Sequence, residues 1–99
     1  MSYYLVKSSN FIRSAKKLAR KYPNFLIELN ETLKILTSNL YDSRLKTHKL
    51  NGEMKEFWAC SINYELRIIF QLVNAIDEES GNTVEAILLN NIGTHDEVY

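Results

Sequence analysis

Five side chains have the types and positions that acid–base chemistry on a phosphodiester requires: His48, Glu65, Arg67, His95 and Tyr99. Histidine exchanges protons near neutral pH, and glutamate can act as a base or hold an arginine. Arginine presents a planar fork of donors to phosphate, and tyrosine stacks on a base or donates a hydrogen bond. This set suits RNA cleavage, in which the 2′-hydroxyl needs a base, the leaving 5′-oxygen an acid and the phosphorane a fixed cation.

Each of these residues also has a simpler interpretation. A histidine alone is commonly a turn or cap residue, and a tyrosine alone, such as Tyr99, is commonly a packing residue. Arg67 lies inside an apolar segment, where a charge needs a partner or a ligand, and the Glu65 carboxylate is one candidate partner. Both histidines fall at expected strand or loop ends, where functional sites gather, so the five together favour a site over five unrelated roles.

The sequence lacks the motifs of metal-dependent, nucleotide-binding and serine-hydrolase chemistry. The chain has two histidines and no H-E-x-x-H motif, no glycine-rich phosphate loop and no nucleophile elbow, so we expect no metal and no cofactor. Cys60 is the single cysteine, which excludes an internal disulfide and favours a buried apolar role. No apolar run approaches the roughly 20 residues of a membrane span, and the first residues lack secretory-signal features. We therefore expect a cytoplasmic protein that is not bound to a membrane.

The elements that must position these residues follow from hydrophobic periodicity. A short strand at residues 3–6 precedes two amphipathic helices at residues 11–22 and 26–40, separated at Pro23. Strand-like segments follow at residues 47–52, 57–62, 65–73 and 83–92, the third being the most apolar and therefore central. Short connections predict one α+β domain over residues 1–99, with a mainly antiparallel four-stranded sheet, the order β-α-α-β-β-β and the helical hairpin on one face.

Charge divides the chain into a basic and an acidic half. Residues 1–49 hold ten Lys and Arg against three Asp and Glu, whereas residues 50–99 hold two against nine. The basic half can contact a polyanion or an acidic protein, or the two halves can neutralise each other across the fold. As RNA-backbone contacts we predict two loop lysines and the outer face of the first helix: Lys46, Lys49, Lys16, Lys17 and Arg20.

The last stretch, residues 87–99, begins as an apolar strand and turns at Gly93. His95 and Tyr99 are four residues apart, which is one helical turn if the tail coils. A coiled tail would place a histidine and an aromatic ring side by side. The alternative is a C-terminal edge strand with a frayed end, which is the commoner fate of terminal residues.

Three segments carry a family resemblance: H-K-L-N-G at residues 48–52, E-L-R-I-I-F at residues 65–70 and G-T-H-D-E-V-Y at residues 93–99. With the element order, they resemble the RelE/ParE superfamily of bacterial toxins, and within it the YafQ-like branch of RelE-type mRNA interferases. The resemblance implies a toxin of a type II toxin–antitoxin pair. Such toxins cut mRNA in the ribosomal A site, and a cognate antitoxin protein wraps and silences them.

The resemblance also implies the site. His48, His95 and Tyr99 match the active-site histidines and final aromatic of the branch, Glu65 matches its acidic residue, and Arg67 matches the arginine of a Y-R-x-x-Y strand. Ser61 and Leu66 stand where the branch often has a histidine and a tryptophan. Two alternatives remain: a non-catalytic gyrase inhibitor of the ParE type, and a degenerate member that only binds its antitoxin.

Overall fold

The order of elements follows the predicted one, and the computed structural model describes residues 3–99. The helices and strands are β1 (Tyr4–Lys7), α1 (Ser9–Lys21), α2 (Phe25–Ser38), β2 (His48–Lys49), β3 (Trp58–Ser61), β4 (Leu66–Ile76), β5 (Thr83–Thr94) and α3 (His95–Val98). Short 3-10 turns lie at Ser43–Leu45 and Gly52–Met54. The Asn-Gly segment expected to close a tight turn after β2 thus belongs to a longer connection that contains the second 3-10 turn.

Both long helices form because capping and apolar spacing agree. The Ser8 hydroxyl accepts the Phe11 N–H at 3.1 Å and caps α1, and it donates to the Asn90 carbonyl at 3.0 Å, which ties the helix start to β5. In α2 the buried stripe starts at Phe25, whereas Leu26, which the leucine spacing places in the core, is 56% exposed. The rest of the predicted stripe, Leu29, Leu33, Leu36 and Leu40, is buried, so only its first position is wrong and Phe25 takes that place.

The sheet has five strands in the order β1-β5-β4-β3-β2, which corrects the predicted four-stranded sheet. β1 runs parallel to β5, and the other neighbouring pairs are antiparallel. The additional strand is the two-residue β2, which pairs with β3 at the edge of the sheet. β1 can run parallel to β5 because α1 and α2 provide the crossover of a dozen or more residues that a parallel pair needs. β4 is central, as predicted, and β5 lies between β1 and β4 instead of at an edge.

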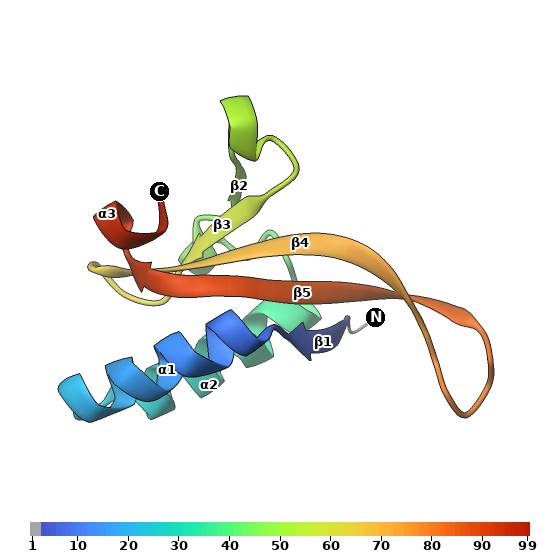
Figure 1. The fold of residues 1–99 in the computed structure, drawn as a ribbon, viewed down its shortest axis with the longest axis horizontal. Helices are drawn as coiled ribbons and strands as arrows, with labels where there is room; N and C mark the ends of the chain where they lie inside the picture. The colour runs from blue at the N-terminus through green and yellow to red at the C-terminus, as the bar shows by residue number, and fades with distance from the viewer. Residues whose placement is uncertain (1–2) are drawn as a thin grey trace.

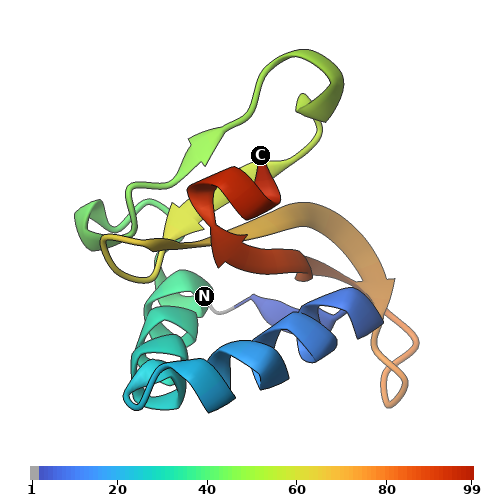
Figure 2. The same cartoon turned by 60° about the vertical axis from the view of Figure 1, so that its left-hand side comes forward.

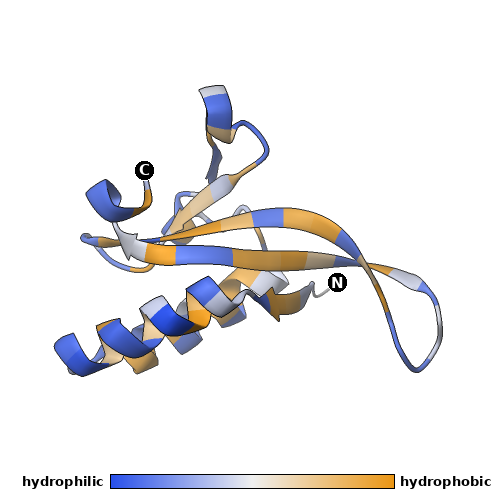
Figure 3. Cartoon of the chain, in the orientation of Figure 1, coloured by the Kyte–Doolittle hydropathy of each residue, from blue (hydrophilic) through white to orange (hydrophobic). Residues whose placement is uncertain are grey.

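The helical hairpin covers one face of the sheet, as predicted (Figure 1). On that face, Leu66, Ile68 and Phe70 of β4 pack with Ile87 and Leu89 of β5 and with the buried residues of the helices. Burying one such side chain contributes roughly 1.5–3 kcal/mol, so this cluster supplies most of the apolar driving force. Figure 3 shows the hydrophilic side of α1 turned outward from this layer.

The opposite face of the sheet, here called the open face, carries α3 (Figures 1 and 2). Val98 of α3 is buried against Ala59 and Ile69 in a second, smaller apolar cluster. Gly93 permits this return, because a Cβ there would lie 3.1 Å from Glu97 Oε1 and 3.2 Å from Val98 Cγ1. The chain can therefore fold its last turn back onto the strands that precede it.

Candidate functional site

Strand register places His48 and Arg67 on the open face. His48 is paired with Ala59, Ala59 with Ile69, and Ile69 with Asn91, which makes one row across four strands. Directly paired residues point to the same face of a sheet, and Ala59 and Ile69 belong to the open-face cluster with Val98. Arg67 is two residues from Ile69 on β4 and shares that face, paired with Ser61 and Gly93.

The C-terminal tail forms a capped helical turn on this face, as the coiled alternative predicts. The Thr94 hydroxyl accepts the Glu97 N–H at 3.4 Å, and the Glu97 carboxylate accepts the Thr94 N–H at 2.8 Å. These hydrogen bonds from Thr94 lower the pKa of Glu97, and the charges of Lys21 and Lys17 act in the same direction. The reciprocal cap holds together a terminal segment that is too short to be a stable helix alone.

This turn brings His95 and Tyr99 into direct contact. Their ring centroids are 4.3 Å apart at an interplanar angle of 76°, an edge-to-face arrangement, and the Tyr99 N–H donates to the His95 carbonyl at 3.1 Å. Partial burial raises the pKa of the Tyr99 phenol, and the positive charge of Arg67 opposes this rise. Arg67 is therefore close enough to Tyr99 for its charge to act on that ring.

The Arg67 side chain is fixed by backbone carbonyls of the β3–β4 turn. Its Nη1 donates to the carbonyls of Asn63 at 2.8 Å, Tyr64 at 3.1 Å and Leu66 at 3.1 Å. Within residues 3–99 no carboxylate lies at ion-pair distance from Arg67, so the alternative of a Glu65–Arg67 pair is not formed. Only Nη1 of the guanidinium is engaged, because Nε and Nη2 form no hydrogen bond in the described part of the chain.

His48 is exposed and is oriented through one ring nitrogen. Its Nδ1 lies 3.0 Å from the carbonyl oxygen of Lys46, which has a left-handed backbone with φ of 52°. Because a carbonyl oxygen only accepts, Nδ1 carries the proton of this hydrogen bond. In the neutral ring, Nε2 is then left unprotonated and free to take a proton, which is the tautomer a general base requires.

The Glu65 side chain is not bonded to any of these groups. It is exposed at the end of the β3–β4 turn, and its backbone N–H donates to Asn63 Oδ1 at 2.9 Å. Its carboxylate forms neither a hydrogen bond nor an ion pair with any of residues 3–99. The side chain instead lines a small hollow together with Tyr22, Asn63, Tyr64 and Leu66.

The predicted RNA-binding cations occupy different surfaces. Lys16 and Arg20 line the groove between α1 and α2. The Nζ of Lys49 lies 5.9 Å from the centre of the Trp58 ring, and Trp58 packs against the helix-side core, so Lys49 points away from the face of His48. Lys17, by its effect on Glu97, lies beside α3, and Lys46 is exposed.

Lys21, a further lysine of the basic face of the first helix that was expected to contact RNA, acts on Glu97 as Lys17 does, one helical turn further along α1. Sequence reasoning missed two other residues around the site. Asn91 shares the row of His48, and only strand register reveals this. Tyr64, in the β3–β4 turn, is the most exposed large apolar or aromatic side chain among residues 3–99, at 95%.

Cys60 is no part of the chemistry. It is buried on β3 on the helix side, as predicted for an apolar role, and burial raises the pKa of its thiol to about 12.

Among residues 3–99, no three His, Cys, Asp or Glu side chains gather as metal ligands do. No helix in this part of the chain is long and apolar enough to cross a membrane.

Comparison with known proteins gives a consistent relationship. A family model described as "Bacterial toxin of type II toxin-antitoxin system, YafQ" matches residues 3–99. YafQ from E. coli is similar in structure, with a TM-score of 0.73 at 17% sequence identity over 98% of each chain. A search of curated proteins by sequence finds no match.

Two solved complexes of toxins with antitoxins are also similar. A chain of the E. coli DinJ-YafQ complex matches with a TM-score of 0.74 at 15% identity over 98% of each chain. A chain of the RelBE2 complex from Mycobacterium tuberculosis matches with a TM-score of 0.67 at 16% identity, over 96% of this chain and 100% of that chain. At these identities the structures establish a common fold.

Proposed function

This chain belongs to the YafQ family of bacterial toxins of type II toxin–antitoxin systems, and from that premise we propose that it is an mRNA endonuclease associated with the ribosome. One observation carries the proposal. The same face of the sheet presents a histidine with a free Nε2 on β2 and an arginine without a carboxylate partner on β4, and α3 places the His95–Tyr99 pair on that face. An acid, a base and a cation on one face are what RNA transesterification requires, and the reaction needs no metal.

The proposed reaction begins at His48. Its Nε2 removes the proton of the 2′-hydroxyl, and the 2′-oxygen attacks the adjacent phosphorus. The bond from phosphorus to the 5′-oxygen breaks, and His95 gives a proton to that oxygen. The products are a 2′,3′-cyclic phosphate and a 5′-hydroxyl, so protons and electrons balance without a co-reactant.

Arg67 and Tyr99 support this step without exchanging protons. Arg67 is anchored through Nη1, so its remaining donors can meet the negative charge that builds on the phosphorane. Tyr99 is held against His95 and orients the nucleotide through its ring. His95 is proposed as the acid because α3 holds its ring on the open face against Tyr99.

Glu65 is the second candidate for the base. We favour His48, because its hydrogen bond to Lys46 fixes one tautomer, whereas the Glu65 carboxylate has no group that orients it. Lys46, Lys49, Lys16, Lys17 and Arg20 are proposed to contact the RNA backbone, together with Lys21. We also propose a cognate antitoxin as protein partner, which is supported by the DinJ-YafQ and RelBE2 complexes of similar toxins.

The test is cleavage of a translated message by purified protein with ribosomes, mapped by primer extension. We expect cleavage by the wild type and a fall of at least about 100-fold for His95→Ala and Arg67→Ala, since each removes a group that acts on the transition state. Glu79→Gln, in the distant β4–β5 loop, is the matched control for loss of one charge. Intact message with the wild type, or full activity in both variants, contradicts the nuclease and favours a non-catalytic toxin.

A further inference from the structure

The ring of Tyr64 is held in water at one end of the sheet. It is 95% exposed, whereas the next most exposed large apolar side chain, Ile76, is 73% exposed. A tyrosine ring gains from leaving water, so full exposure forgoes roughly 1.5–3 kcal/mol of burial. An aromatic ring left in this position is available to a ligand that arrives from outside.

The turn that carries Tyr64 is braced from several sides. Asn63 Oδ1 accepts the N–H groups of Glu65 and Leu66, each at 2.9 Å. Asn63 Nδ2 donates to Glu28 Oε1 of α2 at 3.3 Å, which ties the turn to the helical layer. These bonds fix the backbone on both sides of Tyr64, so the point from which its side chain projects is preorganised for a ligand.

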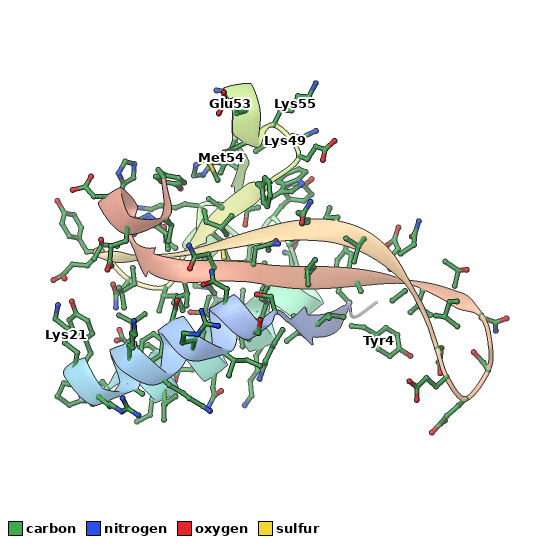
Figure 4. The ribbon with its side chains drawn as sticks, in the orientation of Figure 1. Tyr4, Lys21, Lys49, Glu53, Met54 and Lys55 are labelled. Atoms are coloured by element: carbon green, nitrogen blue, oxygen red, sulfur yellow. The ribbon has the colours of Figure 1, made fainter. Side chains whose placement is uncertain are left out.

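A small hollow lies next to this ring. Tyr22, Asn63, Tyr64, Glu65 and Leu66 line a space of about 150 Å³. The Nζ of Lys21 lies 5.5 Å from the centre of the Tyr22 ring, so a positive charge stands at its margin. Lys21 lies at the opposite end of the molecule from Tyr4 (Figure 4). The hollow thus lies between residues of the turn and Tyr22 of the α1 end, with a cation beside it, and the exposed Tyr64 ring projects from the same turn.

This hollow is coupled to the proposed cleavage site by Arg67. The Arg67 Nη1 donates to the carbonyls of Asn63 and Tyr64, so the arginine and the exposed ring are set by the same three-residue turn. We propose that the turn at residues 63–65 is a nucleotide-binding subsite, which rests on the proposed function. A nucleotide next to the phosphate on Arg67 stacks its base on Tyr64.

The lining also indicates which bases fit. Aromatic stacking accepts every base, because each has a π-face. The Glu65 carboxylate only accepts hydrogen bonds, so at the edge of the stacked base it favours an exocyclic amino group, as in adenine or cytosine, over the carbonyl oxygen of uracil. Glu65 therefore serves recognition while His48 serves as base.

The test is equilibrium binding of 2′-O-methylated trinucleotides, which lack the attacking hydroxyl and are not cut. Fluorescence anisotropy gives the affinity, and NMR shifts of the tyrosine rings give the place of binding. We expect Tyr64→Ala to weaken binding of the adenosine trinucleotide about ten-fold or more, and Tyr64→Phe to restore it, since stacking needs only the ring. Glu65→Gln should narrow the preference for the adenosine over the uridine trinucleotide.

Tyr4→Ala is the matched control, because Tyr4 is an exposed tyrosine at the far end of the sheet. Equal affinity of Tyr64→Ala, Tyr4→Ala and the wild type overturns the subsite. If the wild type cuts message but Tyr64→Ala does not change trinucleotide affinity, the subsite is wrong and the nuclease proposal is retained. Tyr64-dependent binding by a wild type that cuts no message retains the subsite and removes the nuclease.

Discussion

At the scale of single residues, the two histidines of the open face are held in different ways. The carbonyl of Lys46 takes the Nδ1 proton of His48 and leaves Nε2 as an acceptor. His95 has a carboxylate 3.7 Å from Nδ1 and the edge of the Tyr99 ring beside it. The fixed tautomer of His48 supports its proposed role as the base, and His95 is then the remaining histidine for the role of the acid.

The pH dependence of cleavage tests this assignment. A base must be unprotonated and an acid protonated, so the wild-type rate should follow a bell-shaped curve in pH. We expect His48→Ala to lose the acidic limb and His95→Ala the alkaline limb, each with a rate at least about 100-fold lower. Single-turnover rates between pH 5 and 9 measure this. The reverse pattern assigns the roles the other way round.

At the scale of elements, α3 depends on the residues that let it return to the sheet. Gly93 leaves no room for a Cβ beside Glu97 and Val98, and Thr94 and Glu97 close the first turn. Val98 then anchors the turn on Ala59 and Ile69. The placement of His95 and Tyr99 thus relies on packing by residues that take no part in the chemistry.

Gly93→Ala should therefore displace α3. The added methyl group would lie about 3.1–3.2 Å from its neighbours, so we expect unfolding free energy to fall by roughly 1–3 kcal/mol. NMR contacts between the His95 and Tyr99 rings should weaken, and cleavage should fall with them. Gly81→Asn is the control, because Gly81 has open space and a φ of 73° that asparagine tolerates. Unchanged ring contacts in Gly93→Ala would argue against this dependence.

At the scale of the whole molecule, the net charge is zero, but positive and negative charges are concentrated at opposite ends. The outer side of α1 is basic, and the charges of Lys17 and Lys21 act on Glu97 of α3. The acidic residues of the β4–β5 loop lie at the other end of the sheet (Figure 1). A polyanion is therefore attracted to one end of a molecule that is neutral overall.

Salt dependence of RNA binding measures this attraction. Each phosphate contact by a lysine contributes about 0.7 to the slope of log affinity against log salt for a single strand. We expect the double variant Lys17→Gln with Lys21→Gln to lower the slope by about 1.4, whereas Lys34→Gln, on the exposed side of α2, should leave it unchanged. Equal slopes would place the RNA on another surface.

The sequence predicted most of the elements, because their signals are local. Apolar periodicity located α1, α2 and the central strand β4, Ser8 and Pro23 marked the limits of α1, and the tail signature identified the family that the comparison confirmed. Four strands were expected where five form, and Leu26 was placed in a core that contains Phe25. Both errors concern how elements meet, which spacing along one element does not report.

The residues of the proposed site could be selected from the sequence, since their types determine the chemistry on offer. Tertiary structure alone decided their relation to one another. Strand register put His48 and Arg67 on one face, a glycine returned the last turn to that face, and backbone carbonyls fixed Arg67 and the His48 tautomer. These contacts join residues far apart in the chain or depend on backbone geometry, and neither leaves a signal in composition or spacing.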